Sequence, residues 1–294
     1  MTRQTTPVTF TFDGRDGTTV TAYRWEPGGD ARAVVQLTHG MGEHVLRYGH
    51  LADALTGAGF LVVGQDHRGH GASAASPAEQ GQIGADGWAG LVDDIDVLVG
   101  RSHDEHPDLP LVLLGHSMGS FAVQQYLLDH SEDVTAAVLT GTAALNLLEP
   151  ALDLDKPIDL AMFNAPFAPA RTDFDWLSRD ESQVDAYIAD PGCGFGLDTA
   201  AGKALFAGAR DAGDPARLAA IRPDLPLYIA VGDKDPVNGQ LALVNALVDR
   251  YQVAGLTDIT LVTYPDARHE IFNETNRAEV EAGLIAWLDQ VVPR

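Results

Sequence analysis

A serine between a short apolar stretch and a helical stretch is the feature that most constrains the fold of this chain. Residues 111–114 (LVLL) have the character of a strand buried on both faces, and residues 117–128 have the composition of a helix. The pentapeptide GHSMG around Ser117 fits the Gly-x-Ser-x-Gly pattern of a nucleophile elbow, whose glycines leave room for a strained serine backbone. This pattern predicts that the Ser117 hydroxyl lies at the carboxyl edge of a sheet.

The segments around this turn alternate between apolar strands and helices. We expect strands at residues 33–37, 60–64, 111–115, 136–141, 227–232 and 259–264, and helices at about 48–58, 86–103, 117–130, 238–251 and 276–291. Residues 7–26 alternate around two Asp-Gly pairs, which predicts an antiparallel hairpin. The predicted fold class is therefore α/β, with a mostly parallel, doubly wound sheet covered on both faces.

The stretch from residue 142 to residue 223 interrupts this alternation. It is rich in Pro, Ala and Asp, and its pattern favours short helical pieces without a convincing strand. Since a structureless loop of this length is improbable in a compact domain, we interpret residues 142–223 as an inserted helical cap on a core formed by residues 1–141 and 224–294. Three roles are open for its apolar segment 160–169: lining a pocket, contacting a lipid interface or packing on the core.

The charge balance limits the classes of partner. The chain has 19 Lys and Arg against 42 Asp and Glu, a formal net charge of −23, which argues against binding to nucleic acids and to anionic membranes. The first ten residues lack the apolar region of a signal peptide, and no run is long enough to span a bilayer. We therefore expect a cytoplasmic protein that acts on a small molecule without a cofactor, and the sequence leaves its oligomeric state open.

A serine becomes a good nucleophile only when a base takes its proton and a third group orients that base. In hydrolases with this elbow, the acid and then the histidine follow the serine, on loops after late strands. His269 is the only histidine after His130, so this order assigns it as the base. His116 adjoins Ser117, and we expect its side chain to point to the other side of the tight turn.

Two aspartates compete for the role of the acid. Asp233 and Asp235 both follow the predicted strand at residues 227–232. Asp235 lies farther out on the loop, where it reaches a neighbouring loop more easily, and it is favoured over Asp233. Asp233 is expected to cap or brace the turn.

Two backbone amides are predicted to bind an oxyanion. The Met118 amide follows the nucleophile and opens the helix, and the Met41 amide lies between Gly40 and Gly42 in the loop after a buried strand. Such donors stabilise the negative charge of a tetrahedral intermediate. An ordinary glycine turn is the alternative interpretation of the Met41 loop.

Other chemistry-bearing side chains receive structural interpretations. Asp66, His67 and His70 lack the spacing of a known metal site, so a hydrogen-bonding role is favoured. Cys193 is the only cysteine, which excludes an intrachain disulfide, and we expect no cysteine-based metal site. Its thiol is expected to be an inert apolar group or to line the substrate entrance.

The motifs HGMGEHVLRYGHLADAL, DHRGHGAS, GHSMGS, GDKDPV and ARHEIFNE occur in one order along the chain. Together they resemble the monoglyceride lipase and lysophospholipase-like branch of the serine α/β hydrolases. The resemblance covers roughly residues 30–145 and 225–292, and a similar run occurs at residues 175–195. It implies an α/β-hydrolase fold with Ser117 as nucleophile, Asp235 as acid, His269 as base, and the Met41 and Met118 amides as oxyanion donors.

The same resemblance suggests residues that contact the substrate. Glu43 and Arg47 match positions that help to bind the glycerol end in monoglyceride lipases. A salt bridge that braces the Met41 loop is the alternative role for this pair. Phe272 stands where some family members have another polar glycerol contact, which weakens the case for glycerol.

The function expected from the sequence is that of a serine hydrolase that cleaves carboxylic esters through an acyl-enzyme, with monoacylglycerol-type or other small monoesters as substrates. An aminopeptidase of the same fold is one alternative. A non-catalytic ligand-binding homologue is the other.

Overall fold

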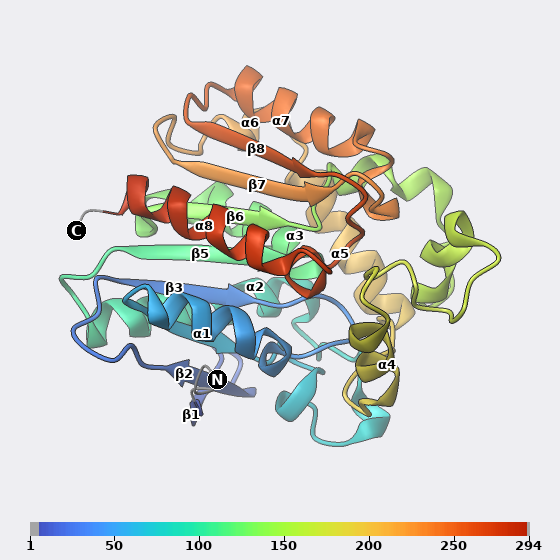
Figure 1. Cartoon of the computed structure of the whole chain (residues 1–294), viewed down its shortest axis with the longest axis horizontal. Coiled ribbons are helices and arrows are strands. Elements are labelled where there is room, and N and C mark those ends of the chain that lie inside the picture. Colours follow the sequence, from blue (N-terminus) through green and yellow to red (C-terminus); the bar gives the residue numbers. More distant parts are fainter. Residues whose placement is uncertain (1–5, 293–294) are drawn as a thin grey trace.

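An eight-stranded sheet forms the centre of the computed structural model, which describes residues 6–292 (Figure 1). The strand order is β1-β2-β4-β3-β5-β6-β7-β8. The strands are β1 (Val8–Asp13), β2 (Thr19–Trp25), β3 (Ala33–Thr38), β4 (Phe60–Gln65), β5 (Leu111–His116), β6 (Ala136–Thr140), β7 (Leu227–Gly232) and β8 (Ile259–Tyr264). Strands β3 to β8 pair in parallel, and β2 pairs antiparallel with both β1 and β4. The predicted α/β sheet with an antiparallel hairpin is confirmed.

Helices cover both faces of this sheet. They are α1 (Gly49–Gly57), α2 (Gly87–Glu105), α3 (Met118–His130), α4 (Glu181–Ala189), α5 (Thr199–Asp211), α6 (Pro215–Leu218), α7 (Ala242–Ala254) and α8 (Arg277–Val291). α1 and α8 pack on one face, whereas α2, α3 and α7 pack on the other (Figure 1). In β5, Val112 and Leu114 face the first layer, and Leu111 and Leu113 face the second. This explains why the strand is apolar at successive positions.

Residues 142–223, here called the cap segment, connect β6 to β7. All of them are described, and they contain α4, α5, α6 and several 3₁₀ turns but no strand. The expectation of only short helical pieces is wrong for α5, which has 13 residues, as many as α3. Its buried residues Ala201, Leu205 and Phe206 lie on one face. Gly208 leaves room for the Trp88 indole, because a Cβ at this position would collide with the indole nitrogen. The boundaries of the cap segment as a domain stay a prediction, and the predicted core ends at residues 1 and 294 lie outside the described residues.

The carboxyl ends of the parallel strands bring distant loops to one edge of the sheet. The loop after β3 (residues 39–44, here called the β3 loop), the turn at Ser117, and the loops 233–238 and 265–269 all begin there. Within residues 6–292, no helix combines the length and the apolar character needed to cross a bilayer.

Candidate active site

Ser117 lies in a strained turn between β5 and α3. Its backbone has φ 51° and ψ −121°, a combination that a residue with a side chain rarely adopts and that is typical of functional sites. Gly115 has no room for a side chain, because a Cβ there would lie 2.6 Å from the Gly119 carbonyl oxygen. A Cβ at Gly119 would collide with the Thr38 carbonyl oxygen. Both glycines of the predicted elbow are therefore required by the close packing of strand and helix.

The structure brings Asp235 against His269. The Nδ1 atom of His269 lies 2.9 Å from Oδ2 of Asp235, and both side chains are buried. The other carboxylate oxygen of Asp235 accepts a hydrogen bond from the Val237 amide at 2.9 Å. The carboxylate of Asp233 instead accepts from the Asp266 amide at 2.8 Å and so joins the loop after β7 to the loop after β8.

The two neighbouring histidines of the site differ in their proton affinity. Burial lowers the pKa of His269, but the charge and the hydrogen bond of Asp235 outweigh this effect and raise the pKa above its ordinary value. Burial and the charge of His269 lower the pKa of His116 to about 4. The expectation that His116 points away is wrong, because its ring centroid lies 4.8 Å from that of His269 and both side chains line one cavity. Its Nδ1 atom lies 3.0 Å from the Thr140 hydroxyl, so it is held as a neutral ring beside the base.

The two predicted oxyanion donors come from different loops. Met118 is the first residue of α3, so its amide has no acceptor within the helix. Met41 lies in the β3 loop before Gly42, whose φ is +64°, and both methionines line one cavity with the serine. The Gly42 carbonyl accepts hydrogen bonds from the Tyr187 hydroxyl at 2.8 Å and from the Gly194 amide at 3.0 Å. The cap segment thus holds the β3 loop from outside.

A buried ionic network lies next to these donors. One Glu43 oxygen accepts from the Gly40 amide at 2.6 Å and from the Tyr48 hydroxyl at 2.8 Å, and the other accepts from Arg47 at 2.6 Å. Arg47 also donates two hydrogen bonds to Glu270, at 2.6 and 2.7 Å. Burial raises the pKa of Glu43, but the Arg47 charge and the other donors lower it overall. These contacts are those of a brace on the β3 loop.

Two cavities meet at Ser117. One has an almost entirely apolar lining, with Leu148, Leu152, Phe163 and Leu205 from the cap segment among its walls. The other has a mixed lining, in which the polar side chains are Glu43, His116, Tyr187, His269 and Glu270 together with Ser117, and the apolar ones are Met41, Leu160, Trp176 and Leu177. The serine therefore has an apolar space on one side and a space with several polar groups on the other.

Three residues of the site escaped sequence reasoning. Glu270 pairs with Arg47, and Tyr187 holds the β3 loop. The Trp176 ring centroid lies 4.8 Å from that of His269, and the Trp176 carbonyl accepts from the His269 amide at 3.3 Å. Glu270 follows the predicted base within ARHEIFNE, and the two aromatic residues lie in the run at residues 175–195. Those motifs were the only signal that could have identified them.

Two predicted contact residues lie outside both cavities. Phe272 is 2% exposed and packs in the core layer of α1 and α8, where its carbonyl oxygen lies 2.6 Å from Nε2 of His50. Cys193 is half-buried and lies near His44 and Asp190. Neither side chain lines the space around Ser117.

The Asp66–His70 segment makes structural hydrogen bonds. The Asp66 carboxylate accepts from the Val45 amide at 2.9 Å and from the Ala72 amide at 2.8 Å. Nδ1 of His70 lies 3.1 Å from the Arg68 carbonyl oxygen, and burial lowers the pKa of His70 to about 4. These contacts agree with the hydrogen-bonding role that the sequence favours.

Comparisons with known proteins cover almost the whole chain. Residues 29–276 match the family described as serine aminopeptidase, S33. The monoacylglycerol lipase of Mycolicibacterium smegmatis is 34% identical over 287 residues, which is 94% of this chain and 95% of the relative. The monoglyceride lipase of Mus musculus is 32% identical over 180 residues, 60% of this chain and 57% of the relative. A thermostable carboxyl esterase from Bacillus coagulans, solved in complex with glycerol, has a TM-score of 0.87 at 26% identity and covers 98% of this chain and 99% of its own.

Proposed function

We propose that the substrates of this chain, which belongs to the S33 family of serine hydrolases, join one acyl chain to a small polar alcohol. Monoacylglycerols are the leading class. The premise is that the chain is a carboxylic ester hydrolase. The observation that carries this proposal is the presence of two cavities with different linings at Ser117. The almost entirely apolar lining of one cavity suits an acyl chain, and the hydroxyl, imidazole and carboxylate groups in the other suit a hydroxylated alcohol. The relatives named for monoacylglycerol hydrolysis support the same substrate class.

In the proposed first half-reaction, the Ser117 hydroxyl attacks the ester carbonyl while Nε2 of His269 takes its proton. The Asp235 carboxylate, 2.9 Å from Nδ1, stabilises the imidazolium that forms. The Met41 and Met118 amides bind the oxyanion of the tetrahedral intermediate. The intermediate then expels the alcohol, which takes the proton from His269, and leaves an acyl group on the serine.

In the second half-reaction, a water molecule attacks the acyl-enzyme and His269 takes the proton of that water. The second tetrahedral intermediate expels the serine oxygen, which regains its proton from the histidine. The products are the carboxylic acid and the free enzyme. The raised pKa of His269 places the acid side of the rate profile above the ordinary value for histidine, since catalysis requires the neutral ring.

The lining of the cavities does not favour the aminopeptidase alternative. An aminopeptidase needs carboxylates that face the amino group of its substrate. The cap segment contributes only apolar and aromatic side chains to both cavities, and the lining carboxylates Glu43 and Glu270 are paired with Arg47. Ester hydrolysis is therefore the better match to this geometry.

The test is a substrate series at matched enzyme concentration. We expect kcat/KM to be higher for monoacylglycerols than for ethyl and aryl esters of the same acyl chain, and amino-acid p-nitroanilides to be inert. Ser117→Ala provides the background rate. An equal or higher rate on the ethyl esters would remove glycerol from the proposal, and cleavage of the anilides would favour the peptidase.

The cytoplasmic location and a transient contact of the cap segment with a lipid interface stay predictions. Leu147, Met162 and Ile188 of the cap segment are 44%, 41% and 48% exposed, which supports the second. Sedimentation with neutral phospholipid vesicles, with and without alanine at these three positions, would test it.

A further inference from the structure

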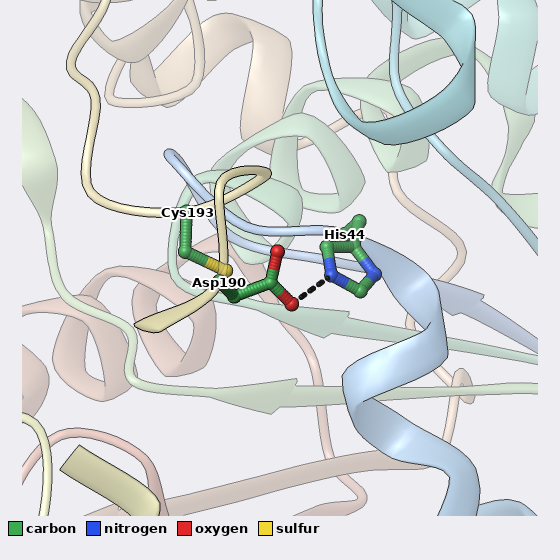
Figure 2. A group of neighbouring side chains, drawn as sticks. All are labelled: His44, Asp190 and Cys193. Carbon is green, nitrogen blue, oxygen red and sulfur yellow. Dashed lines mark hydrogen bonds and ion pairs between the residues drawn. The ribbon is translucent and has the colours of Figure 1, made fainter. Parts of the chain in front are cut away.

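Three potential metal ligands meet where the cap segment contacts the β3 loop. His44 ends the β3 loop, and Asp190 and Cys193 lie in the loop that follows α4 (Figure 2). The Nε2 atom of His44 lies 3.0 Å from Oδ2 of Asp190. One donor atom from each residue, including the Cys193 sulfur, lies within 4.8 Å of the other two. The proposed hydrolysis uses none of these three side chains as acid, base or nucleophile.

The chemistry of the three donors fits a thiophilic divalent cation. An imidazole nitrogen, a carboxylate oxygen and a thiolate sulfur together suit Zn²⁺ better than Mg²⁺ or Ca²⁺, which prefer oxygen ligands. In a tetrahedral zinc site, bonded nitrogen and oxygen atoms are about 3.3 Å apart, close to the spacing of His44 and Asp190. The other Asp190 oxygen accepts from the Gly192 amide at 2.7 Å, which orients the carboxylate as a supporting shell does.

The charges around the sulfur also favour a dication. The carboxylates of Glu43, Asp190 and Glu270 and the guanidinium of Arg47 lie near the sulfur, so that its charged neighbours are net negative. Such a surrounding attracts a divalent cation, whose charge compensates that of the thiolate when the thiol loses its proton to solvent. A single cysteine excludes a site made of cysteines alone. The sequence predicts no cysteine-based site, and that expectation stays an untested prediction; a mixed site would need His44, which lies far from Cys193 in the sequence.

We propose that His44, Asp190 and Cys193 form a three-ligand site for a thiophilic divalent cation, with Zn²⁺ as the leading candidate. The site would join two loops that are already in contact. The Gly194 amide donates to the Gly42 carbonyl at 3.0 Å, and a Cβ at Gly42 would collide with the Phe195 carbonyl oxygen. A bound cation therefore ties residues 190–195 to the β3 loop and restrains the opening of the cap segment at that point.

The experiment measures metal binding rather than ester hydrolysis, so it does not depend on the proposed function. Full-length protein is stripped with a chelator and titrated calorimetrically with Zn²⁺, and Cd²⁺ is added in parallel to detect the ultraviolet charge-transfer band of a metal–thiolate bond. We expect one Zn²⁺ per chain, a Cd²⁺–thiolate band, and a rise in the thermal midpoint with Zn²⁺. Cys193→Ala should abolish the band, and Cys193→Ala and Asp190→Asn should each weaken Zn²⁺ binding at least roughly tenfold.

A second cluster in the chain provides a matched control. Asp96, His130 and Asp133 also place donor atoms within 4.8 Å of one another, but they include no sulfur, and Asp133 is exposed. His130→Ala should keep the zinc affinity and the cadmium band of the wild type. The proposal is overturned if the wild type binds no Zn²⁺, if Cys193→Ala binds it as tightly as the wild type, or if only His130→Ala loses it. Thermal unfolding of each stripped variant verifies that it is folded.

Discussion

Two regions of the molecule meet at Ser117, and they are built from different kinds of contact. The loops at the sheet edge are joined by short contacts between buried polar groups, such as His269 with Asp235 at 2.9 Å and Arg47 with Glu43 at 2.6 Å. The cap segment supplies mainly apolar walls from separate short elements. A substitution that removes one partner of a buried polar contact removes the whole interaction, whereas shortening an apolar side chain removes only part of its contact area. We therefore expect changes at the loops to abolish the reaction and changes in the cap segment to tune its selectivity.

The largest effect expected at the sheet edge is that of Ser117→Ala. Loss of the nucleophile should reduce kcat for ester hydrolysis by roughly 10⁴–10⁶-fold, because the remaining groups then act only through binding and the oxyanion donors. A fluorophosphonate probe should label the wild type and leave the variant unlabelled, while both unfold at a similar temperature. Labelling that survives the substitution would assign the nucleophile to another residue.

Asp233 and Asp235 lie on one loop, and their substitutions should distinguish a catalytic role from a role in loop stability. Asp235→Asn should lower kcat by roughly 10⁴-fold, because it removes the charge that stabilises the His269 imidazolium. Asp233→Asn is the matched control, since its carboxylate accepts from the backbone amide of Asp266 at 2.8 Å and lies 3.6 Å from Nζ of the exposed Lys234, away from His269. We expect it to lower the free energy of unfolding by about 1 kcal/mol and to change kcat less than tenfold. The reverse pattern in steady-state kinetics would make Asp233 the acid.

The buried histidines that make the protein sensitive to mild acid lie in the core, because residues 142–223 contain no histidine. Burial lowers the folded-state pKa of His70 and of His116 to about 4, below the unfolded-state value of about 6.5. The unfolded state therefore binds more protons between about pH 6.5 and pH 4, and the free energy of unfolding falls across this window as the pH falls. The loss is up to about 3 kcal/mol for each histidine.

Urea unfolding at several pH values measures this loss, and His116→Gln should show a shallower dependence than the wild type. His269 contributes with the opposite sign, because its pKa is raised in the folded state. Its stabilisation is complete below the unfolded-state pKa and is lost as the pH rises through the folded-state pKa. Equal slopes for His116→Gln and the wild type would show that His116 is not the source of the acid sensitivity.

The smallest effect is expected from the cap segment. Phe163 lines the apolar cavity and packs against Trp176 with ring centroids 5.1 Å apart, whereas the neighbouring Met162 is 41% exposed. Phe163→Ala should lower kcat/KM for long acyl chains by roughly 5–30-fold, about 1–2 kcal/mol, and leave acetate esters within about threefold of wild type. Met162→Ala should change neither. An equal loss on short and long chains would mean that this wall positions the catalytic loops instead.

The same contrast explains how much the sequence could predict. Residues 111–114 could be predicted as a strand because helices cover both faces of the sheet there, so that each position must be apolar. The strained serine required glycines on either side, and this requirement leaves a sequence motif. Asp235 was favoured over Asp233 from its place on the loop, and the structure has it 2.9 Å from His269. Its catalytic role stays a prediction.

The parts that could not be predicted depend on contacts between distant segments. Arg47 and Glu270 are 223 positions apart, and the sequence around neither residue predicts their ion pair. Helix α5 was expected only as a short piece, because its two glycines disfavour a long helix, although its alanines favour one, and its packing against α2 depends on a distant segment. His116 was expected to point away from the site. Its position next to Ser117 in the sequence gives no information about the His269 ring, which lies beside the His116 ring in the fold.

The direct pairing of β6 with β7 has a consequence for the history of such chains. Ala137 to Thr140 pair in register with Leu227 to Ala230, although the whole cap segment lies between them in the sequence. The entropy lost in closing a loop grows only with the logarithm of its length, so that doubling the inserted chain costs about 0.6 kcal/mol. Longer insertions between these two strands therefore add little to the entropic cost of folding. A chain of this architecture can exchange or enlarge the segment over its serine while the strands that hold the reacting groups remain as they are.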